Sequence, residues 1–182
     1  MALRFDNKIF YHIPKTGGSY VRKIIESLTD DWSQIGKTHA TPYDTSLALY
    51  SFCVVRDPID WYRSYFRYRI SGGRGGWNMD CMFDKVCAAD TFEKFCLNVI
   101  NTTIAGTTGY VGCLYIPFLK VNRILRFERL DEELADFFKH YKNFKPIAPV
   151  KVSPKTINTR LSKKTLKKLR RYEAGICNFL GY

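Results

Sequence analysis

The sequence lacks long apolar runs and the residue patterns of metal sites. No apolar run approaches the roughly 18 residues of a membrane span, so we expect none. Only three histidines and no CxxC pair are present, which argues against a zinc site, and we predict no bound metal. The N-terminal stretch MALRFDNKIFY is too short and too charged for a secretory signal. These absences predict a soluble, intracellular protein.

Acidic residues are also scarce: the 182 residues include 17 aspartates and glutamates but 29 lysines and arginines. The net charge of +12 predicts attraction to anions, with nucleic acid, anionic polysaccharide and phosphorylated cofactors all open. Much of the excess lies in RLSKKTLKKLRRYE, residues 160–173. We interpret this run as a solvated helix face whose leucines turn inward.

The six cysteines form no recognisable disulfide or metal framework. Cys53 and Cys96 lie in apolar surroundings and are interpreted as core thiols. Cys81 and Cys87 flank a loop and could pair with each other, although sequence alone does not fix connectivity. A mostly reduced protein is the default expectation.

Predicted strands alternate with predicted helices along the chain. Strands are expected at residues 7–13, 50–55 and 122–127, and helices after residue 18, after Pro58, at 91–100, at 131–141 and near the C-terminus. This order is typical of a parallel sheet with helices on both faces, a three-layer α/β architecture. The length suits one domain, so we predict a single domain over residues 1–182.

The segment PKTGGS, residues 14–19, joins the first strand to the first helix. Gly17 and Gly18 allow a tight turn that brings backbone N–H groups close to an anion, and the helix adds its positive end. Lys15 supplies a charge. The alternative is a plain strand-to-helix turn with an exposed lysine. The ATPase pattern GxxxxGK[ST] is absent, because the lysine precedes the glycines.

A second strand-to-helix junction, VVRDPIDWYRSYF, begins at Val54. Asp57 and Pro58 are a strong helix start. Ser64 lies about two turns along the helix, on the same face as the cap, so Arg56 and Ser64 could converge on one anion. The alternative is a structural Arg–Asp pair with a solvent-facing serine. Together the two junctions describe two anion sites at one sheet edge.

These two segments resemble the signature segments of the sulfotransferase family, especially members that sulfate carbohydrates. The donor of that family is 3′-phosphoadenosine 5′-phosphosulfate (PAPS), and its product is the desulfated nucleotide PAP. The resemblance implies a P-loop-like fold and 5′-phosphosulfate contacts from Lys15, Thr16, Gly17, Gly18, Ser19 and Tyr20. It further implies that Arg56 and Ser64 hold the 3′-phosphate and that Lys155 or Arg160 closes over the nucleotide. Trp61, Tyr62 and Trp77 are candidates for stacking on adenine.

The resemblance also implies the chemistry of an in-line transfer to an acceptor hydroxyl. Lys15 would neutralise the leaving phosphate, so no metal is required. The acceptor needs a general base, and His39, between the two junctions, is our candidate. His12 is interpreted as a core residue and His140 as a solvated one. Glu26 and Asp44 are fallback bases.

Three functions therefore remain in view. The favoured one is a PAPS-dependent sulfotransferase acting on a hydroxyl, expected to belong to a carbohydrate and to suit an anionic glycan. A nucleotide-dependent kinase with an atypical loop would need magnesium. A basic nucleic-acid-binding domain would use residues 163–171 but leaves Arg56 and Ser64 unexplained. The sequence discloses neither the acceptor nor the oligomeric state.

Overall fold

The computed structural model describes residues 2–36, 40–43, 49–72, 76–102, 109–148, 154 and 156–182. The chain divides into two compact units: unit 1 comprises residues 1–56 and 115–151, and unit 2 comprises residues 57–114 and 152–182. The single domain over residues 1–182 stays a prediction. Within the described residues, no helix combines the length and the apolar character that crossing a membrane requires.

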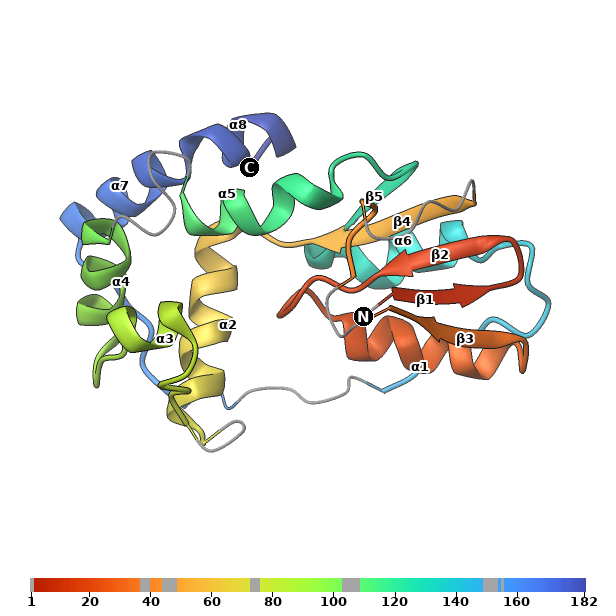
Figure 1. Cartoon of the computed structure of the whole chain (residues 1–182), viewed down its shortest axis with the longest axis horizontal. Helices are drawn as coiled ribbons and strands as arrows, with labels where there is room; N and C mark the ends of the chain where they lie inside the picture. Colours follow the sequence, from red (N-terminus) through yellow and green to blue (C-terminus); the bar gives the residue numbers. More distant parts are fainter. Residues whose placement is uncertain are drawn as a thin grey trace. The chain divides into compact units, whose positions relative to one another are not determined.

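Unit 1 is built around a sheet (Figure 1). Its strands are β1 (Ala2–Phe5), β2 (Lys8–Tyr11), β3 (Trp32–Ile35), β4 (Tyr50–Val55) and β5 (Arg123–Arg126). Among the described residues they form one five-stranded sheet in the order β3-β1-β2-β4-β5. The chain is therefore an α/β protein, as predicted.

The expectation of an all-parallel sheet is only partly right. β4 runs parallel to both β2 and β5, but β1 is antiparallel to both β2 and β3. The physical reason is a hairpin: Phe5 pairs with Lys8 across a two-residue turn in which Asp6 adopts a φ of 45°. Such a turn reverses the chain within two residues, which a parallel connection cannot do.

One face of this sheet is covered by α1 (Gly18–Leu28) and α6 (Leu130–Phe137). The helices and strands share a buried apolar core: Leu3, Phe5, Phe10, Val21, Ile24, Ile25, Phe52, Val54, Leu125, Leu130, Leu134 and Phe138. The opposite face meets the 3₁₀ turn η1 (Ile116–Phe118), where the rings of Phe118 and Tyr11 are 6.3 Å apart. Helix α6 starts at Leu130, after the 3₁₀ turn η2 (Phe127–Arg129), and ends at Phe137, four residues before the end of the helix predicted at 131–141.

Unit 2 is helical in its described residues. It contains α2 (Pro58–Ile70), α3 (Met82–Cys87), α4 (Phe92–Asn101), most of α5 (Tyr110–Tyr115), α7 (Lys163–Tyr172) and α8 (Ala174–Leu180). As predicted, Asp57 caps α2: its Oδ1 accepts from the Asp60 N–H at 2.9 Å, and Pro58 occupies the first turn. Aromatic rings dominate the core; Trp61, for example, is 1% exposed and stacks on Tyr65 at 4.9 Å.

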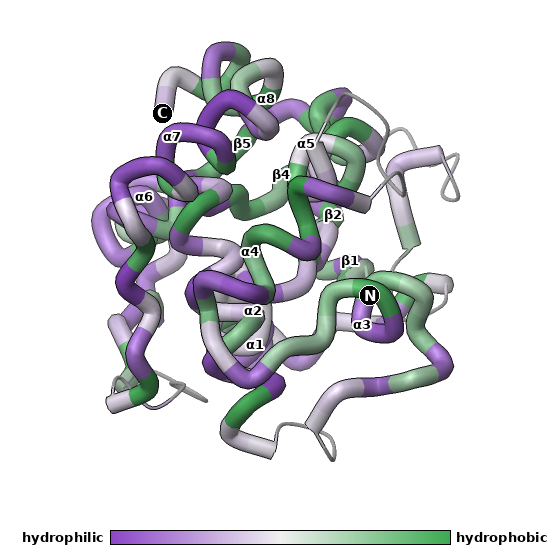
Figure 2. The backbone as a smooth tube through the Cα atoms, turned by 90° about the vertical axis from the view of Figure 1, so that its left-hand side faces the viewer, coloured by the Kyte–Doolittle hydropathy of each residue, from purple (hydrophilic) through white to green (hydrophobic). Residues whose placement is uncertain are grey.

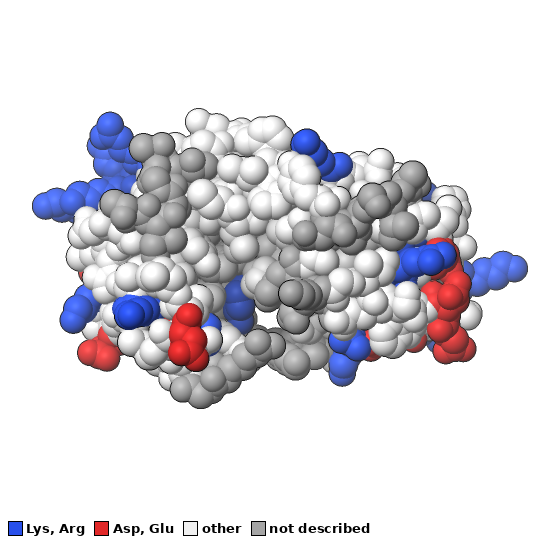
Figure 3. All heavy atoms as spheres, in the orientation of Figure 1, with Lys and Arg blue, Asp and Glu red and all other residues white. Residues whose placement is uncertain are grey.

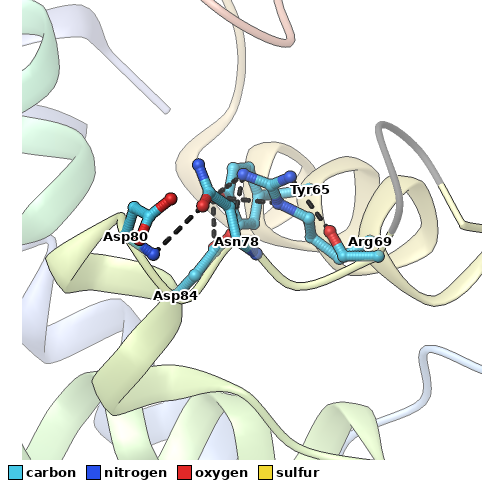
Figure 4. Close-up of polar contacts among 6 residues, drawn as sticks. Tyr65, Arg69, Asn78, Asp80 and Asp84 are labelled. Atoms are coloured by element: carbon cyan, nitrogen blue, oxygen red, sulfur yellow. Dashed lines mark hydrogen bonds and ion pairs between the residues drawn. The ribbon is translucent and has the colours of Figure 1, made fainter.

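A buried ion pair fastens the segment after α2 (Figure 4). The Arg69 guanidinium contacts the carboxylate of Asp84 at 2.7 Å, and the Asp84 side chain is fully buried. Asp84 also accepts from the Tyr65 hydroxyl at 2.5 Å and from the Asn78 N–H at 2.8 Å. Arg69 donates to the Gly76 carbonyl at 3.1 Å. The network therefore ties Gly76 to α2 through Arg69 and Asn78 to α3 through Asp84.

Two further carboxylates secure helix starts in unit 2. Glu173, fully buried, accepts from the N–H groups of Val111 and Gly112 at 3.0 Å each, at the start of α5, and burial raises its pKa. Glu93 accepts from the N–H of Ser162 at 2.9 Å and from its hydroxyl at 2.7 Å, at the start of α7. Hydrogen bonds from Thr165 and Ser162 lower the pKa of Glu93.

Candidate functional site

The two signature junctions begin at neighbouring parallel strands of unit 1. Tyr11, the last residue of β2, pairs with Cys53 of β4, and both strands run in the same direction. The segment after β2 that carries Lys15 and the Arg56 that follows β4 therefore emerge at the same edge of the sheet. This is the edge at which open α/β sheets bind ligands.

The loop between β2 and α1 holds an unusual backbone. Lys15 adopts a φ of 66° and Gly17 a φ of 86°, both in the left-handed region. A lysine there is strained, and strained residues cluster at ligand-binding positions. Thr16 is fully buried and its hydroxyl donates to the Ile13 carbonyl at 2.8 Å, which closes the loop. The Thr16 hydroxyl thus holds the loop in shape, and its contact with a nucleotide stays a prediction.

Gly18 is required by its neighbour, whereas Gly17 is favoured by its positive φ. A Cβ on Gly18 would lie 1.8 Å from the Cδ2 atom of His12, so only glycine fits beside this ring. A Cβ on Gly17 would lie 3.0 Å from the Leu130 side chain and 3.1 Å from Phe127. The loop is therefore packed against the segment that leads into α6.

The N-terminus of α1 has the properties of an anion site. Gly17 is the N-cap residue and makes no side-chain capping hydrogen bond, and the first turn contains no acidic residue. The Gly17 carbonyl instead accepts from the N–H groups of Tyr20 at 2.9 Å and Val21 at 3.2 Å. The N-terminus of this eleven-residue helix, which carries the positive end of the helix dipole, thus lies directly after Lys15 and Thr16.

Arg56 lies against this loop. Its guanidinium carbon is 4.1 Å from the centre of the Phe127 ring, and Nη1 reaches the Lys15 carbonyl at a long 3.5 Å. Its backbone is fixed by the buried Tyr115, whose hydroxyl accepts from the Arg56 N–H at 3.1 Å and donates to the Arg56 carbonyl at 2.9 Å. The structure therefore brings Lys15 and Arg56 together within one unit.

The next residues of the loop lie at the start of α1. The Tyr20 hydroxyl donates to Asp131 of α6 at 2.7 Å, and burial with this carboxylate raises the pKa of Tyr20 to about 12. Ser19 is half-buried at the N-terminal turn of α1. Nucleotide contacts from Ser19 and Tyr20 stay predictions.

Ser64 and Arg160 belong to unit 2. Ser64 is half-buried on α2, so its pairing with Arg56 spans both units and stays a prediction. Arg160 is exposed at the rim of a cavity of about 250 Å³. That cavity is lined by Phe66, Ile70, Asp90, Thr91, Phe92, Glu93, Ile157, Asn158 and Arg160. Lys155 lies outside the described residues.

The structure describes three of the five candidate general bases. His39 and the fallback Asp44 lie outside the described residues, so neither prediction is tested. His140 is exposed after α6, and Glu26 forms an ion pair with Arg22 at 2.5 Å. His12, interpreted from the sequence as a core residue, is instead half-buried against the glycine loop.

The structure narrows the candidates for adenine stacking. Trp61 is 1% exposed and Tyr62 is fully buried, with its hydroxyl donating to Glu173 at 2.5 Å, so neither ring has an open face. Trp77 is half-buried and packs on Phe95, with 5.6 Å between ring centres. Of the three, Trp77 alone retains accessible surface.

The six cysteines all lie in the described part of the chain and form no disulfide there, so Cys81 and Cys87 do not pair in this structure. Cys53 is fully buried, as expected of a core thiol, and burial raises its pKa to about 12. Cys96 is likewise buried. Within the described ranges, no cluster of three or more histidine, cysteine or acidic side chains could hold a metal ion.

Sequence reasoning missed two residues at this edge. Phe127 supplies the ring that holds the Arg56 guanidinium, although its segment was interpreted only as the end of a strand. Arg126 ends β5 in register with Val55 of β4, so a third cation follows a third parallel strand. The available signal was the RILRF segment itself, where an arginine directly precedes the last residue of the predicted strand 122–127.

Comparisons with known protein families, with curated proteins and with solved structures find no match to this chain.

Proposed function

We propose that this protein is a PAPS-dependent sulfotransferase that moves a sulfuryl group to an acceptor hydroxyl, in a P-loop-like sulfotransferase fold. The observation that carries the proposal is the meeting of Lys15, the uncapped N-terminus of α1 and the Arg56 guanidinium at one edge of parallel strands. The resemblance of PKTGGS and RDPIDWYRSYF to the family's two signatures gives this anion site a specific ligand.

The hydrogen-bond donors of the site suit a nucleotide that carries two phosphate-type groups. Backbone N–H groups at a helix start bind a phosphate-type group without needing a counter-charge. A guanidinium grips a second phosphate through two parallel hydrogen bonds. In this proposal the loop from Lys15 to Tyr20 binds the 5′-phosphosulfate, and Arg56 and Ser64 hold the 3′-phosphate. Lys155 or Arg160 closes over the nucleotide.

The transfer step makes limited demands on the protein. PAPS supplies the sulfuryl group, and the bridging oxygen of its 5′-phosphate gains charge as it leaves. The Lys15 ammonium offsets that charge, and the rigid loop keeps the reacting atoms in line. His39 accepts the proton of the acceptor hydroxyl in this scheme. The acceptor class that suits a +12 chain is an anionic carbohydrate.

A thermal-shift comparison tests the donor. We expect PAP (3′,5′-ADP) to raise the melting temperature, with ATP–magnesium and DNA giving smaller shifts, because a ligand at 100 times its Kd stabilises the fold by about 2.7 kcal/mol. Stabilisation by ATP–magnesium alone would favour a kinase, and stabilisation by DNA alone a nucleic-acid binder.

The transfer chemistry needs its own assay. With labelled PAPS and a panel of carbohydrate acceptors, we expect Lys15→Ala to lower the transfer rate by at least about 100-fold, in the range found for lost electrostatic stabilisation. Lys23→Ala, at an exposed lysine about one and a half turns along α1, is the matched control and should keep normal turnover. Near-normal turnover in Lys15→Ala would remove this residue from the mechanism.

A further inference from the structure

Helix α7 presents a face made entirely of cations. Its basic residues are all exposed, and we call them the cationic face: Lys163, Lys164, Lys167, Lys168, Arg170 and Arg171. Leu169 and Thr165 of the same helix are buried within unit 2. Figure 2 shows α7 as a largely hydrophilic stretch of backbone, and Figure 3 shows cationic side chains projecting from the end of unit 2 where α7 lies.

The six cations form one continuous surface. At about 100° per residue, they fall within an arc of about 160°, and the buried residues occupy the rest of the helix. From Lys163 to Arg171 the face is about 12 Å long at 1.5 Å per residue. An extended anionic chain could therefore contact several cations at once.

These cations are not paired with any acidic side chain in the described part of the chain. Among the residues that the structure describes, none of the six forms an ion pair. Some other surface cations are paired, as Arg123 is with Asp136 and Arg129 with Glu133. The positive charge of the cationic face is thus exposed to solvent and is not offset by an ion pair with a described acidic side chain.

The arrangement also opposes helix stability. Lys163 and Lys164 occupy the first turn, where the helix dipole disfavours cations. Lys163 and Lys167, and Lys164 and Lys168, are like charges four residues apart, which repel. The helix start is held instead by the Ser162 cap and by Glu93. Arg170 and Arg171 lie in the last turn, where the dipole favours cations. Helix stability therefore does not explain why the four lysines, Lys163, Lys164, Lys167 and Lys168, are basic.

We propose that the cationic face is a docking surface for an anionic polysaccharide, the chain that carries the acceptor hydroxyl. This inference rests on the proposed function, because a chain whose hydroxyls become sulfate esters carries repeated negative charge. The face has no aromatic ring on which bases could stack and no amide side chain to read base edges. It also has no apolar residue to enter a membrane. A row of cations complements a repeating polyanion, and the proposed function favours a polysaccharide over a nucleic acid as that polyanion.

The test measures binding of heparin, a sulfated polysaccharide, at three salt concentrations. The variant Lys163→Gln/Lys167→Gln/Arg171→Gln is compared with Lys23→Gln/Lys142→Gln/Lys145→Gln, which removes equal charge from exposed lysines of unit 1. We expect the α7 variant to bind at least about 10-fold more weakly and its salt slope to fall by about 3. The control should change by less than about 2-fold. Circular dichroism checks that both variants fold.

Equal weakening in the two variants would overturn the proposal, since attraction would then follow net charge alone. Tighter binding of single- or double-stranded DNA than of heparin, lost in the α7 variant, would overturn the polysaccharide as occupant. Binding of 3′,5′-ADP is measured in parallel and should be the same in both variants. If 3′,5′-ADP binds but the α7 variant keeps its affinity for heparin, the docking surface fails and the proposed function stands. If 3′,5′-ADP does not bind the unmodified protein, the proposed function fails independently.

Discussion

Gly18 illustrates how a missing side chain shapes the loop. The position where its Cβ would stand is 1.8 Å from His12 and 2.3 Å from the Nε2 atom of that ring. We expect Gly18→Ala to lower the free energy of unfolding by about 2 kcal/mol, because the ring or the start of α1 must move. Urea denaturation measures the change. The same variant should weaken 3′,5′-ADP binding.

Gly175→Ala is the matched control for that substitution. Gly175 also lies near the start of a helix, α8, but a Cβ there meets nothing within 4 Å. Alanine should leave stability unchanged or raise it by up to about 1 kcal/mol. Equal behaviour of the two alanine variants would contradict the packing of His12 on Gly18.

The Arg69–Asp84 pair predicts a large effect on stability within unit 2. Asp84→Asn leaves the Arg69 guanidinium, whose side chain is 10% exposed, without its counter-charge. Breaking a buried pair costs about 3 kcal/mol, so we expect a loss of that order in denaturant unfolding. Arg63→Ala, which removes a surface pair with Asp60, should cost less than about 1 kcal/mol. A loss under about 1 kcal/mol for Asp84→Asn would contradict the buried network.

At the scale of elements, the start of α7 predicts a pH dependence. Hydrogen bonds from Thr165 and Ser162 lower the pKa of Glu93 below its ordinary 4.5. A carboxylate with a lowered pKa stabilises the fold above pH 4.5, and this stability is lost as the pH falls through the lowered pKa. Glu93→Gln should therefore be less stable than the unmodified protein near pH 6, with the difference shrinking toward pH 3.

Urea unfolding at several pH values checks this difference. Glu132→Gln, an exposed position on α6, is the control and should give a small difference that does not vary with pH. If the stability difference between Glu93→Gln and the unmodified protein grew as the pH fell, the assigned direction of the Glu93 pKa shift would be wrong.

The elements that could be predicted are those with strong local signals. Asp57 and Pro58 mark the start of α2, and the apolar spacing of Val21, Ile24 and Ile25 marks α1. β1 was missed because the sequence analysis placed the first strand at residues 7–13, although three of the four β1 residues are buried. β3 was missed because none of its four residues is buried, so it carries no apolar pattern. Their pairing depends on a hairpin and on contacts distant in sequence.

The candidate site was predictable to a similar degree. Lys15, the two glycines and Arg56 follow strands that the sequence shows clearly, so their shared edge could be anticipated. Phe127 could not, because its contact with Arg56 joins residues 71 positions apart. Nor could the orientation of His12, since this residue lies just beyond the four-residue strand β2, where the alternation of side chains no longer applies.

At the scale of the whole molecule, the chain passes between the units three times, and the two passages that lie in the described residues have no linker. Arg56 and Asp57 are consecutive, Asp57 caps α2, and the second crossing falls inside α5, between Leu114 and Tyr115. We expect calorimetry to show one cooperative transition, because α5 cannot unfold in one unit and persist in the other. Two separate transitions would contradict the single domain predicted over residues 1–182.

The central claim is that Lys15 and Arg56 bind opposite ends of one adenosine nucleotide. Isothermal titration with 3′,5′-ADP and 5′-AMP tests it most directly, because the two ligands differ by the 3′-phosphate alone. We predict that the unmodified protein prefers 3′,5′-ADP by about 10- to 150-fold, the worth of charged hydrogen bonds. Arg56→Ala should abolish this preference. Lys15→Ala should lower the affinity for both ligands by the same factor, and the control Arg129→Ala should leave both affinities unchanged. A full preference for 3′,5′-ADP in Arg56→Ala would contradict the claim.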